Sequence, residues 1–493
     1  MGLAVHVQKP VIIVHYHLGS GGVTRVIENQ AKALSREGIP YLILSGETYM
    51  GDETLEVSVI PGLGYRDEAE NITKDGKDLF DQCLMAIVSK FPDDDVTWLI
   101  HNPTLGKNIL WPILLTHIST LEQGILLQCH DFAEDGRALN YQRVSHTNFH
   151  YPIASHIHYA FINSRDQGIL EEAGLTEENS HLLPNAISPP NVIGDYHIKP
   201  GNLLLYPVRG IRRKNIGEVA LWSLLAPSNT QFAITLKPEN EQWLPYYEMW
   251  KEFSEELSLP IQFGVVGNTN APGQSGKSFE DWLQGSTHCI TTSIAEGFGL
   301  TYLEPLSLNI PLIGRDLPEI TKDFKEKGCE LGQLYTSILI PASLVNSDLL
   351  KEDLINGLET SYLSYQAEYD HNHLARAWFN LDSGGYLDFG NLPEHHQVSV
   401  LQALQKDPSI EIFVQLEKGS LLPAKSWFAD ALAANVKDHQ NALQDYSLVS
   451  YGQKLLHLLN KTRKSEVSDV TWLSTQEILK TYLAPERFHF LKV

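Results

Sequence analysis

The chain has 493 residues, of which 43% are hydrophobic and 20% are charged. These values are ordinary for a globular protein of two to four domains. A net charge of −23 argues against nonspecific binding to nucleic acid or to an anionic membrane. The four cysteines are dispersed and indicate neither a zinc site nor a disulfide framework. Because no apolar run approaches the ~20 residues of a membrane span and residues 1–10 lack a signal-peptide core, we expect a cytoplasmic enzyme.

The N-terminal part of the chain alternates short apolar runs with amphipathic stretches. Strands are expected over residues 11–15, 41–45, 97–101, 124–129 and 158–162, and a glycine-rich turn at 19–22 precedes a predicted helix over 23–36. Strands that alternate with helices predict a parallel sheet covered on both faces. Ligands of such sheets bind beyond the carboxyl ends of the strands. This sequence places His15, His17, His101, Asn102 and His130 at those ends.

A second alternating series follows a segment rich in Pro, Asn and Gly at residues 184–200. Its strands are expected over 203–207, 232–236, 261–266, 288–292 and 310–313, with a surface loop at 267–276. We therefore expect one Rossmann-like domain over residues 1–195 and a second over 196–460. Residues 371–423 are either an insertion or a looser continuation of the second domain. Residues 461–493 are expected to form a helical tail that packs back on the first domain.

The segment 291–316 carries the clearest functional signal. Glu296 and Glu304 flank a Gly-Phe-Gly turn just ahead of a predicted helix. Gly297 and Gly299 permit the positive φ of a tight turn, and a helix start directs free backbone N–H groups at an anion. A loop that attracts an anion and also presents two carboxylates suits a ligand that is phosphorylated and rich in hydroxyl groups, such as a nucleotide sugar.

Four cations lie close together after the first strand of the second series. They are Arg209, Arg212, Arg213 and Lys214, in a chain that is otherwise acidic. A guanidinium that binds phosphate through two hydrogen bonds, together with a lysine point charge, is suited to a diphosphate. The alternative is a solvated basic turn, and the Gly-Phe-Gly turn in the same domain favours phosphate binding over it.

Four motifs, in this order and spacing, resemble those of the family 4 retaining glycosyltransferases. They are the loop GSGGVTRV after the first strand, Pro184-Asn185, Arg209 followed by Lys214, and Glu296 followed by Glu304. The resemblance covers residues 10–350 and, more weakly, 440–460. It implies an α/β GT-B fold, in which two Rossmann-like domains with parallel sheets face each other across a cleft, plus a helical C-terminal extension. The segments HDFAEDGR and YPVRGIRRKN also resemble enzymes that make glucosyl or mannosyl compatible solutes.

The resemblance implies a role for each matching residue. Arg209 and Lys214 would neutralise the diphosphate, Glu304 would bind the ribose, and Glu296 would position the sugar without acting as a nucleophile. The donor-binding residues would be Gly21, Gly22, Asn185, Arg209, Lys214, Phe298, Gly299, Leu300 and Glu304, and the catalytic residues His130, Arg209, Lys214 and Glu296. Val208, Ala186 and Pro305 depart from the family pattern, which bears on fine positioning.

The implied reaction moves a hexose, glucose or mannose, from a UDP- or GDP-sugar to a small soluble hydroxylated acceptor. Configuration would be retained, and no metal or other cofactor is expected. His17, His101, Asn102 and Arg137 would line the acceptor side, where Arg137 either meets an anionic acceptor or pairs with the acids of its own loop. Two alternatives stay open: another GT-B activity, such as a sugar-nucleotide epimerase or a phosphorylase, and a catalytically inactive subunit that binds a sugar nucleotide.

Overall fold

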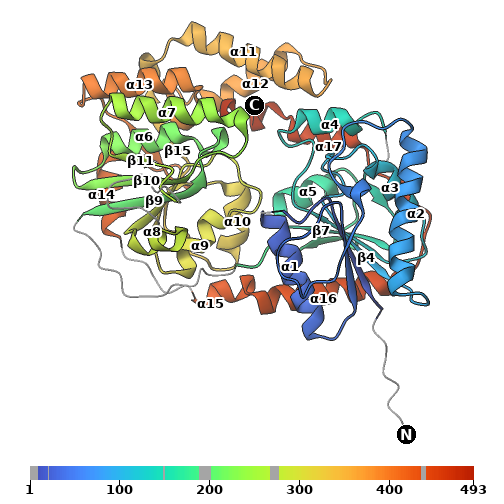
Figure 1. The fold of residues 1–493 in the computed structure, drawn as a ribbon. Coiled ribbons are helices and arrows are strands. Elements are labelled where there is room, and N and C mark those ends of the chain that lie inside the picture. Colours follow the sequence, from blue (N-terminus) through green and yellow to red (C-terminus); the bar gives the residue numbers. More distant parts are fainter. Residues whose placement is uncertain are drawn as a thin grey trace. The chain divides into compact units, whose positions relative to one another are not determined.

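The computed structural model describes residues 9–19, 21–147, 150–187, 201–266, 277–434 and 440–492. The chain divides into two compact units, each built around its own sheet (Figure 1). The first unit comprises Met1–Ala186 with Asp445–Leu483, and the second comprises Ile187–Gln444 with Ala484–Val493. The expected boundary at 195 and the expected surface loop at 267–276 both lie outside the described residues.

The first unit contains a seven-stranded parallel sheet with the order β3-β2-β1-β4-β5-β7-β8. Its strands are β1 (Val11–His15), β2 (Tyr41–Ser45), β3 (Val57–Val59), β4 (Thr97–His101), β5 (Ile125–Cys129), β7 (Ile157–Phe161) and β8 (Ser180–Leu182). Successive side chains of β1 enter two separate cores, because neighbours on a strand face opposite sides of the sheet. Ile12 and Val14 join one core, and Val11 and Ile13 join the other. Both faces are therefore buried, as in other parallel sheets.

The two faces of this sheet are covered by helices from both sequence segments of the unit, the N-terminal one and the C-terminal one. The core that contains Ile12 includes side chains of α2 (Ile72–Lys90), α3 (Trp111–Ser119), α5 (Ser164–Glu172) and α17 (Thr475–Tyr482). The opposite core is covered by α1 (Gly22–Arg36) and α16 (Leu448–Lys464). A short helix, α4 (Ala138–Val144), follows β5. A two-stranded antiparallel pair joins β6 (Pro152–Ile153) to β19 (Thr471–Trp472).

The division of the C-terminal part differs from the expected one. Residues 446–460 were expected in the second domain, but α16 buries Tyr451, Leu455 and Leu459 in the first unit. Residues 484–493 were expected to belong to a tail on the first domain, but they pack within the second unit, where Glu486 pairs with Arg376. The apolar stripe of a helix shows that one face is buried. It does not show which sheet the helix covers.

The second unit contains a six-stranded parallel sheet with the order β11-β10-β9-β12-β13-β14. Its strands are β9 (Asn202–Arg209), β10 (Thr230–Leu236), β11 (Ile261–Phe263), β12 (His288–Thr291), β13 (Leu312–Arg315) and β14 (Gln333–Tyr335). Its connecting helices are α6 (Ile216–Leu225), α7 (Leu244–Glu256), α8 (Phe279–Gly285), α9 (Leu300–Ser307) and α10 (Pro318–Glu326). Two doubly wound units of this kind confirm the predicted fold class.

A four-stranded antiparallel sheet extends the second unit, with the order β16-β15-β17-β18. It is formed by β15 (Ser337–Pro341), β16 (Tyr386–Asp388), β17 (Phe413–Gln415) and β18 (Leu421–Pro423), accompanied by α11 (Ser347–Ser364), α12 (His371–Leu381), α13 (Glu394–Lys406), α14 (Ala424–Ala433) and α15 (Gln440–Leu443). Residues 371–423, which the sequence left open, supply three of these strands. Helix α13 packs against α6, which is why α6 is buried along most of its length.

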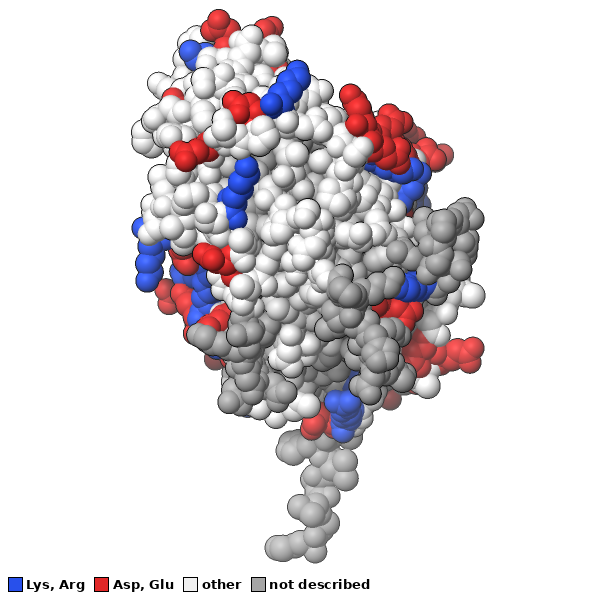
Figure 2. All heavy atoms as spheres, turned by 90° about the vertical axis from the view of Figure 1, so that its left-hand side faces the viewer, with Lys and Arg blue, Asp and Glu red and all other residues white. Residues whose placement is uncertain are grey.

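Two further observations concern the charged side chains on the surface and the apolar character of the helices. On the face drawn in Figure 2, basic and acidic side chains lie scattered among uncharged residues rather than in separate patches. Among the helices of the described ranges, none combines the length and the apolar character that crossing a membrane requires.

Candidate active site

The loop between β9 and α6 carries a buried lysine. The Lys214 side chain is only 10% exposed, and its ammonium group donates to the Glu296 carboxylate. The Lys214 carbonyl accepts hydrogen bonds from the Tyr206 hydroxyl and from Thr292 Oγ1, both at 2.9 Å. Asn215 follows in the left-handed conformation, with φ of 50°, and helix α6 starts there. Side chains of β9 and of the loop after β12 therefore hold the backbone of Lys214 in place.

Glu296 lies in the loop after β12 and meets two cations. Arg213 Nη1 is 3.6 Å from Glu296 Oε2 and donates to the Ala295 carbonyl at 2.9 Å. Burial by itself would raise the pKa of Glu296, but the charges of Lys214 and Arg213 outweigh burial and hold that pKa below its usual value. Burial lowers the pKa of Lys214, although Glu296 opposes the change. The two loops thus hold a preformed group of two cations around one carboxylate.

The Gly-Phe-Gly turn leads into helix α9 as expected. Gly299 precedes the helix with φ of 91°, and a Cβ at this position would lie 3.0 Å from the Tyr302 ring and 3.1 Å from Ile320. Both the conformation and the space favour glycine there. Phe298 is buried with its ring edge-on to Phe324, at 5.5 Å between centroids. Leu300 is the first residue of α9, and Glu304 lies half-buried on the same helix.

The structure separates the four expected cations. Lys214 and Arg213 contact Glu296, whereas Arg212 forms a double ion pair with Glu394 at 2.5 and 2.9 Å. Arg209, at the end of β9, pairs with Glu239 at 2.7 Å and keeps 44% of its side chain exposed. Its role at a diphosphate stays a prediction, as do the roles of the other donor residues.

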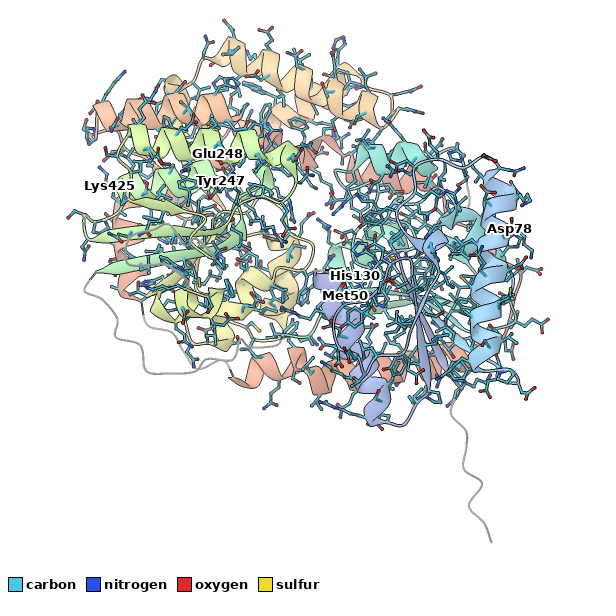
Figure 3. The ribbon with its side chains drawn as sticks, in the orientation of Figure 1. Met50, Asp78, His130, Tyr247, Glu248 and Lys425 are labelled. Carbon is cyan, nitrogen blue, oxygen red and sulfur yellow. The ribbon has the colours of Figure 1, made fainter. Side chains whose placement is uncertain are left out.

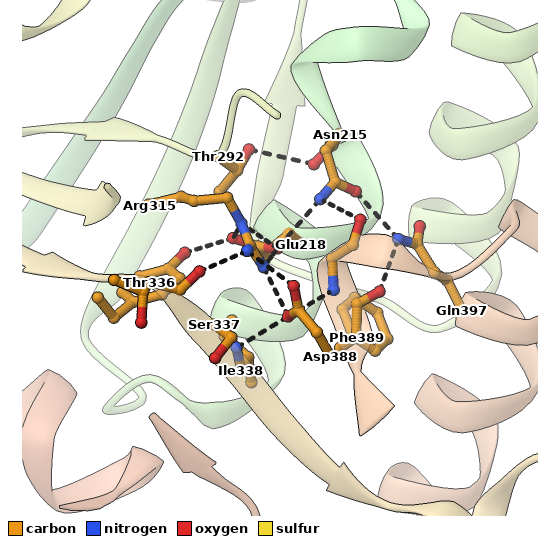
Figure 4. A network of polar contacts seen from close by, with 12 residues as sticks. Asn215, Glu218, Thr292, Arg315, Thr336, Ser337, Ile338, Asp388, Phe389 and Gln397 are labelled. Atoms are coloured by element: carbon orange, nitrogen blue, oxygen red, sulfur yellow. Dashed lines mark hydrogen bonds and ion pairs between the residues drawn. The ribbon is translucent and has the colours of Figure 1, made fainter. Parts of the chain in front are cut away.

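A buried polar network adjoins the lysine loop (Figure 4). The Arg315 guanidinium, at the end of β13, donates to Glu218 at 2.6 Å, to Asp388 at 2.9 Å from both Nη atoms, and to the Thr336 carbonyl at 2.8 Å. Asn215 donates to Glu218 at 3.0 Å. A Cβ at Gly390 would lie 1.9 Å from Arg315 Nη2, so only glycine fits there.

This network ties the antiparallel extension to the residue that follows Lys214. Glu218 is fully buried in the first turn of α6, and the Arg315 side chain is 5% exposed. Gln397 on α13 donates to Asn215 Oδ1 at 3.1 Å and to the Phe389 carbonyl at 3.0 Å. Sequence reasoning missed these residues, because the contacts that bring them together span 73 to 182 positions: Arg315 with Asp388 and Glu218, and Gln397 with Asn215.

In the first unit the predicted histidines form a buried chain. His101 Nδ1 lies 2.9 Å from His130 Nε2, and His101 Nε2 lies 2.8 Å from Gln30 Oε1. Gln30 Nε2 donates to Gln128 Oε1 at 2.6 Å and to the Tyr451 hydroxyl at 2.7 Å. Figure 3 shows His130 inside this unit, and β5 ends at the residue before it.

The chain of hydrogen bonds assigns the tautomers. Gln30 Oε1 can only accept, so His101 Nε2 donates, and a neutral His101 must then accept at Nδ1 from His130 Nε2–H. Burial lowers the pKa of His130 to about 4 and that of His101 well below its usual value, which keeps both rings neutral. His130 Nδ1 is therefore left as a hydrogen-bond acceptor.

The other expected residues of this unit lie nearby. Asn102, with φ of 49°, accepts from the backbone N–H groups of His130 at 2.8 Å and Asp131 at 3.1 Å. His17 Nε2 lies 2.9 Å from the Tyr65 hydroxyl. Arg137 pairs with Asp131 at 2.5 Å and donates to two carbonyls of its own loop.

The glycine loop has open space around it, whereas Asn185 has a buried side-chain oxygen. Gly21 and Gly22 begin α1, and a Cβ at either position would meet no atom within 4 Å. The space beyond this helix start is therefore open. Asn185 Oδ1 is buried, and no group among the described residues donates to it.

One group of side chains could hold a metal in the part of the chain that the structure describes. Asp353, His395 and His396 offer ligand atoms within 4.8 Å of one another. Both histidine Nε2 atoms lie 2.9 Å from the same oxygen, Asp353 Oδ2. A hydrogen bond from each ring accounts for these distances without an ion. The group joins α11 to α13.

Comparison with known proteins gives similarity over the full length. No protein-family model matches the chain. It is 26% identical to a mannosylglucosyl-3-phosphoglycerate synthase of Petrotoga mobilis, over 97% of this chain and 98% of that protein. Sucrose-phosphate synthase of Thermosynechococcus elongatus superposes with a TM-score of 0.51 at 11% identity, over 92% of this chain and 99% of the other. HepE of Anabaena, solved with UDP-glucose, gives 0.51 at 11%, over 92% and 100%.

The fold, the motifs and the full-length relative agree on one class of protein. Two doubly wound parallel-sheet units are the architecture of the GT-B glycosyltransferases. The fold expected from the resemblance is therefore confirmed, and the chain has the GT-B fold.

Proposed function

We propose that the chain transfers a hexose, mannose or glucose, from a UDP- or GDP-sugar to a small soluble acceptor, with retention of configuration and without a metal. The observation that carries the proposal is the buried Lys214–Glu296 pair with Arg213 beside it. These side chains lie in loops that follow the parallel strands β9 and β12, where ligands of such sheets bind.

The proposed chemistry needs fixed positive charge. The bond from the anomeric carbon to the diphosphate oxygen breaks, and the acceptor hydroxyl oxygen bonds to the same face of the sugar. The hydroxyl proton passes to the leaving phosphate oxygen, so no enzyme nucleophile is required. Lys214 would stabilise the developing phosphate charge more than the ground state. Glu296, held ionised by its two cations, would bind hydroxyl groups of the sugar.

The relatives support the choice of substrates. The name of the Petrotoga enzyme contains mannosyl, glucosyl and 3-phosphoglycerate groups, and the Anabaena structure contains UDP-glucose. We propose mannosyl transfer to a glucosylated 3-phosphoglycerate as the first reaction to test. A thermal-shift screen of UDP-, GDP- and ADP-sugars should identify the donor, because a bound ligand raises the melting temperature by mass action.

Variants at the donor side test the assignment directly. Lys214→Ala should lower kcat by about 100- to 1000-fold, and Glu304→Ala should raise the KM for the donor by about tenfold if it loses a ribose hydrogen bond worth about 1.4 kcal/mol. Lys425→Ala, an exposed lysine on α14 labelled in Figure 3, is the matched control. Circular dichroism checks folding. Normal donor turnover by both site variants would refute the assignment, and release of an epimerised sugar without acceptor would refute the transferase.

A further inference from the structure

A second group of cations lies in the first unit, in the segments that follow β4 and β5. Lys107 follows β4, and Arg137 and Arg143 follow β5, so all three come after the carboxyl ends of neighbouring strands. The Lys107 ammonium lies over the Tyr65 ring, 5.1 Å from its centroid. We call Lys107, Arg137 and Arg143 the cation cluster.

The two arginines of the cation cluster pair with carboxylates. Arg143 pairs with Asp67 at 2.7 Å, and Arg137 pairs with Asp131 at 2.5 Å. Across the part of the chain that the structure describes, no carboxylate pairs with Lys107. Among the described residues Lys107 is therefore a cation without a carboxylate partner, in a chain whose net charge is −23.

The position of Lys107 has an energetic consequence. Burial lowers the pKa of Lys107, and repulsion from Arg143 and Arg137 lowers it further, against the attraction of Asp67 and Asp131. An anion beside Lys107 would relieve this repulsion and stabilise the charged ammonium. The cluster therefore gains more from an anion than a solvated surface lysine would.

The cation cluster adjoins the predicted acceptor residues. Tyr65 is 52% exposed, and its hydroxyl lies 2.9 Å from His17 Nε2. Asp131, the partner of Arg137, is held through its backbone N–H by the same Asn102 oxygen that holds His130. Lys107 is thus linked through Tyr65 to His17, and Arg137 through Asp131 to His130.

We propose that Lys107, together with Arg137 and Arg143, binds the anionic group of the acceptor, a phosphate or a carboxylate. The proposal rests on the proposed function and assigns residues to the anionic group of its acceptor. Arg143 has a second role, because its Nη1 donates to the Gly106 carbonyl at 2.6 Å and fixes the loop next to Lys107. Lys107 is accordingly the residue to test first.

The test is a calorimetric titration of the full-length chain with 3-phosphoglycerate, inorganic phosphate and glycerol. Lys107→Met should weaken 3-phosphoglycerate binding at least tenfold, and glycerol should bind neither protein measurably. Lys74→Met is the matched control, because Lys74 on α2 is 69% exposed and forms a surface pair with Asp78. Equal 3-phosphoglycerate affinity in wild type and Lys107→Met would overturn the proposal.

Nucleotide titrations separate the acceptor from the donor. The affinity for GDP and UDP should be unchanged in Lys107→Met, and a loss of nucleotide affinity with 3-phosphoglycerate binding intact would assign the cluster to the donor diphosphate and overturn the proposal. A wild-type protein that bound 3-phosphoglycerate through Lys107 but no nucleotide sugar would refute the transferase and leave the anion site standing.

Discussion

Glu134 in the first unit and Glu296 in the second are buried carboxyl groups in loops that follow parallel strands, yet their pKa values move in opposite directions. Burial raises the pKa of Glu134 to about 7, and the hydrogen bond from the neutral Tyr151 hydroxyl at 2.8 Å opposes this rise without cancelling it. The pKa of Glu296 falls, because Lys214 and Arg213 outweigh burial. The charge of the partner decides the state of a buried acid.

The same contrast extends to the wider polar groups of each unit. At the carboxyl ends of β4 and β5 the first unit buries a neutral chain from Gln30 through His101 to His130, whereas its buried ion pair, Arg165 with Asp166, lies on α5. The second unit buries charges, in the network of Arg315 with Glu218 and Asp388. The first arrangement orients hydrogen-bond donors and acceptors, and the second provides fixed charge.

Breaking the charged network should have the largest effect on stability. Arg315→Leu leaves Glu218 and Asp388 buried without their cation, so we expect a loss of about 3–5 kcal/mol in the free energy of unfolding. Denaturant unfolding followed by circular dichroism measures it. Arg487→Leu, which removes a partly exposed pair with Glu319, should cost less than about 1 kcal/mol. Equal losses in the two variants would show that the buried network contributes no more than a surface pair.

The neutral acid of the first unit should give a pH-dependent effect. Its pKa is about 7 in the folded chain and 4.5 in the unfolded one, so the unfolded state releases the proton first and stability falls as pH rises from about 4.5 to 7. Above pH 7 the loss is complete, on the order of 3 kcal/mol at 1.36 kcal/mol per pKa unit. Glu134→Gln removes this loss.

Melting curves from pH 5 to pH 8 test the predicted direction of this pH dependence. The melting temperature of Glu134→Gln minus that of wild type should increase with pH across this range. A difference that stayed constant would mean that Glu134 is already ionised at pH 5. Glu171→Gln, at a half-buried position of α5, serves as the control for the substitution itself.

Breaking the hydrogen-bond chain from Gln30 through His101 to His130 should have the smallest effect on stability. Gln30→Met keeps the volume but removes the acceptor for His101 Nε2–H, and we expect a cost of about 1–2 kcal/mol. The assigned protonation of His130 at Nε2 should then become mixed, which ¹⁵N chemical shifts of the histidine rings report. An unchanged His130 tautomer would show that Gln30 does not set it.

Much of the fold follows from local patterns in the sequence. Most of the predicted strands lie within two residues of the observed ones, because a continuous apolar run such as 11–15 is buried on both faces of a parallel sheet. The Gly-Phe-Gly turn could be predicted in the same way, because Gly299 adopts a φ that other residues disfavour. Both signals depend on residues that are neighbours in the chain.

Three features were decided only by the tertiary structure. Helix α16 covers the first sheet rather than the second. Arg209 pairs with Glu239, whereas Lys214 pairs with Glu296. Arg315 pairs with one acid from α6 and one from β16. Sequence spacing identified the cations as a group, but it gave no information on which acid would meet each of them. The sequence by itself determined the class of fold and the types of residue at its strand ends. Charge pairing across long separations required the folded chain, because the strength of each pair depends on distance and burial.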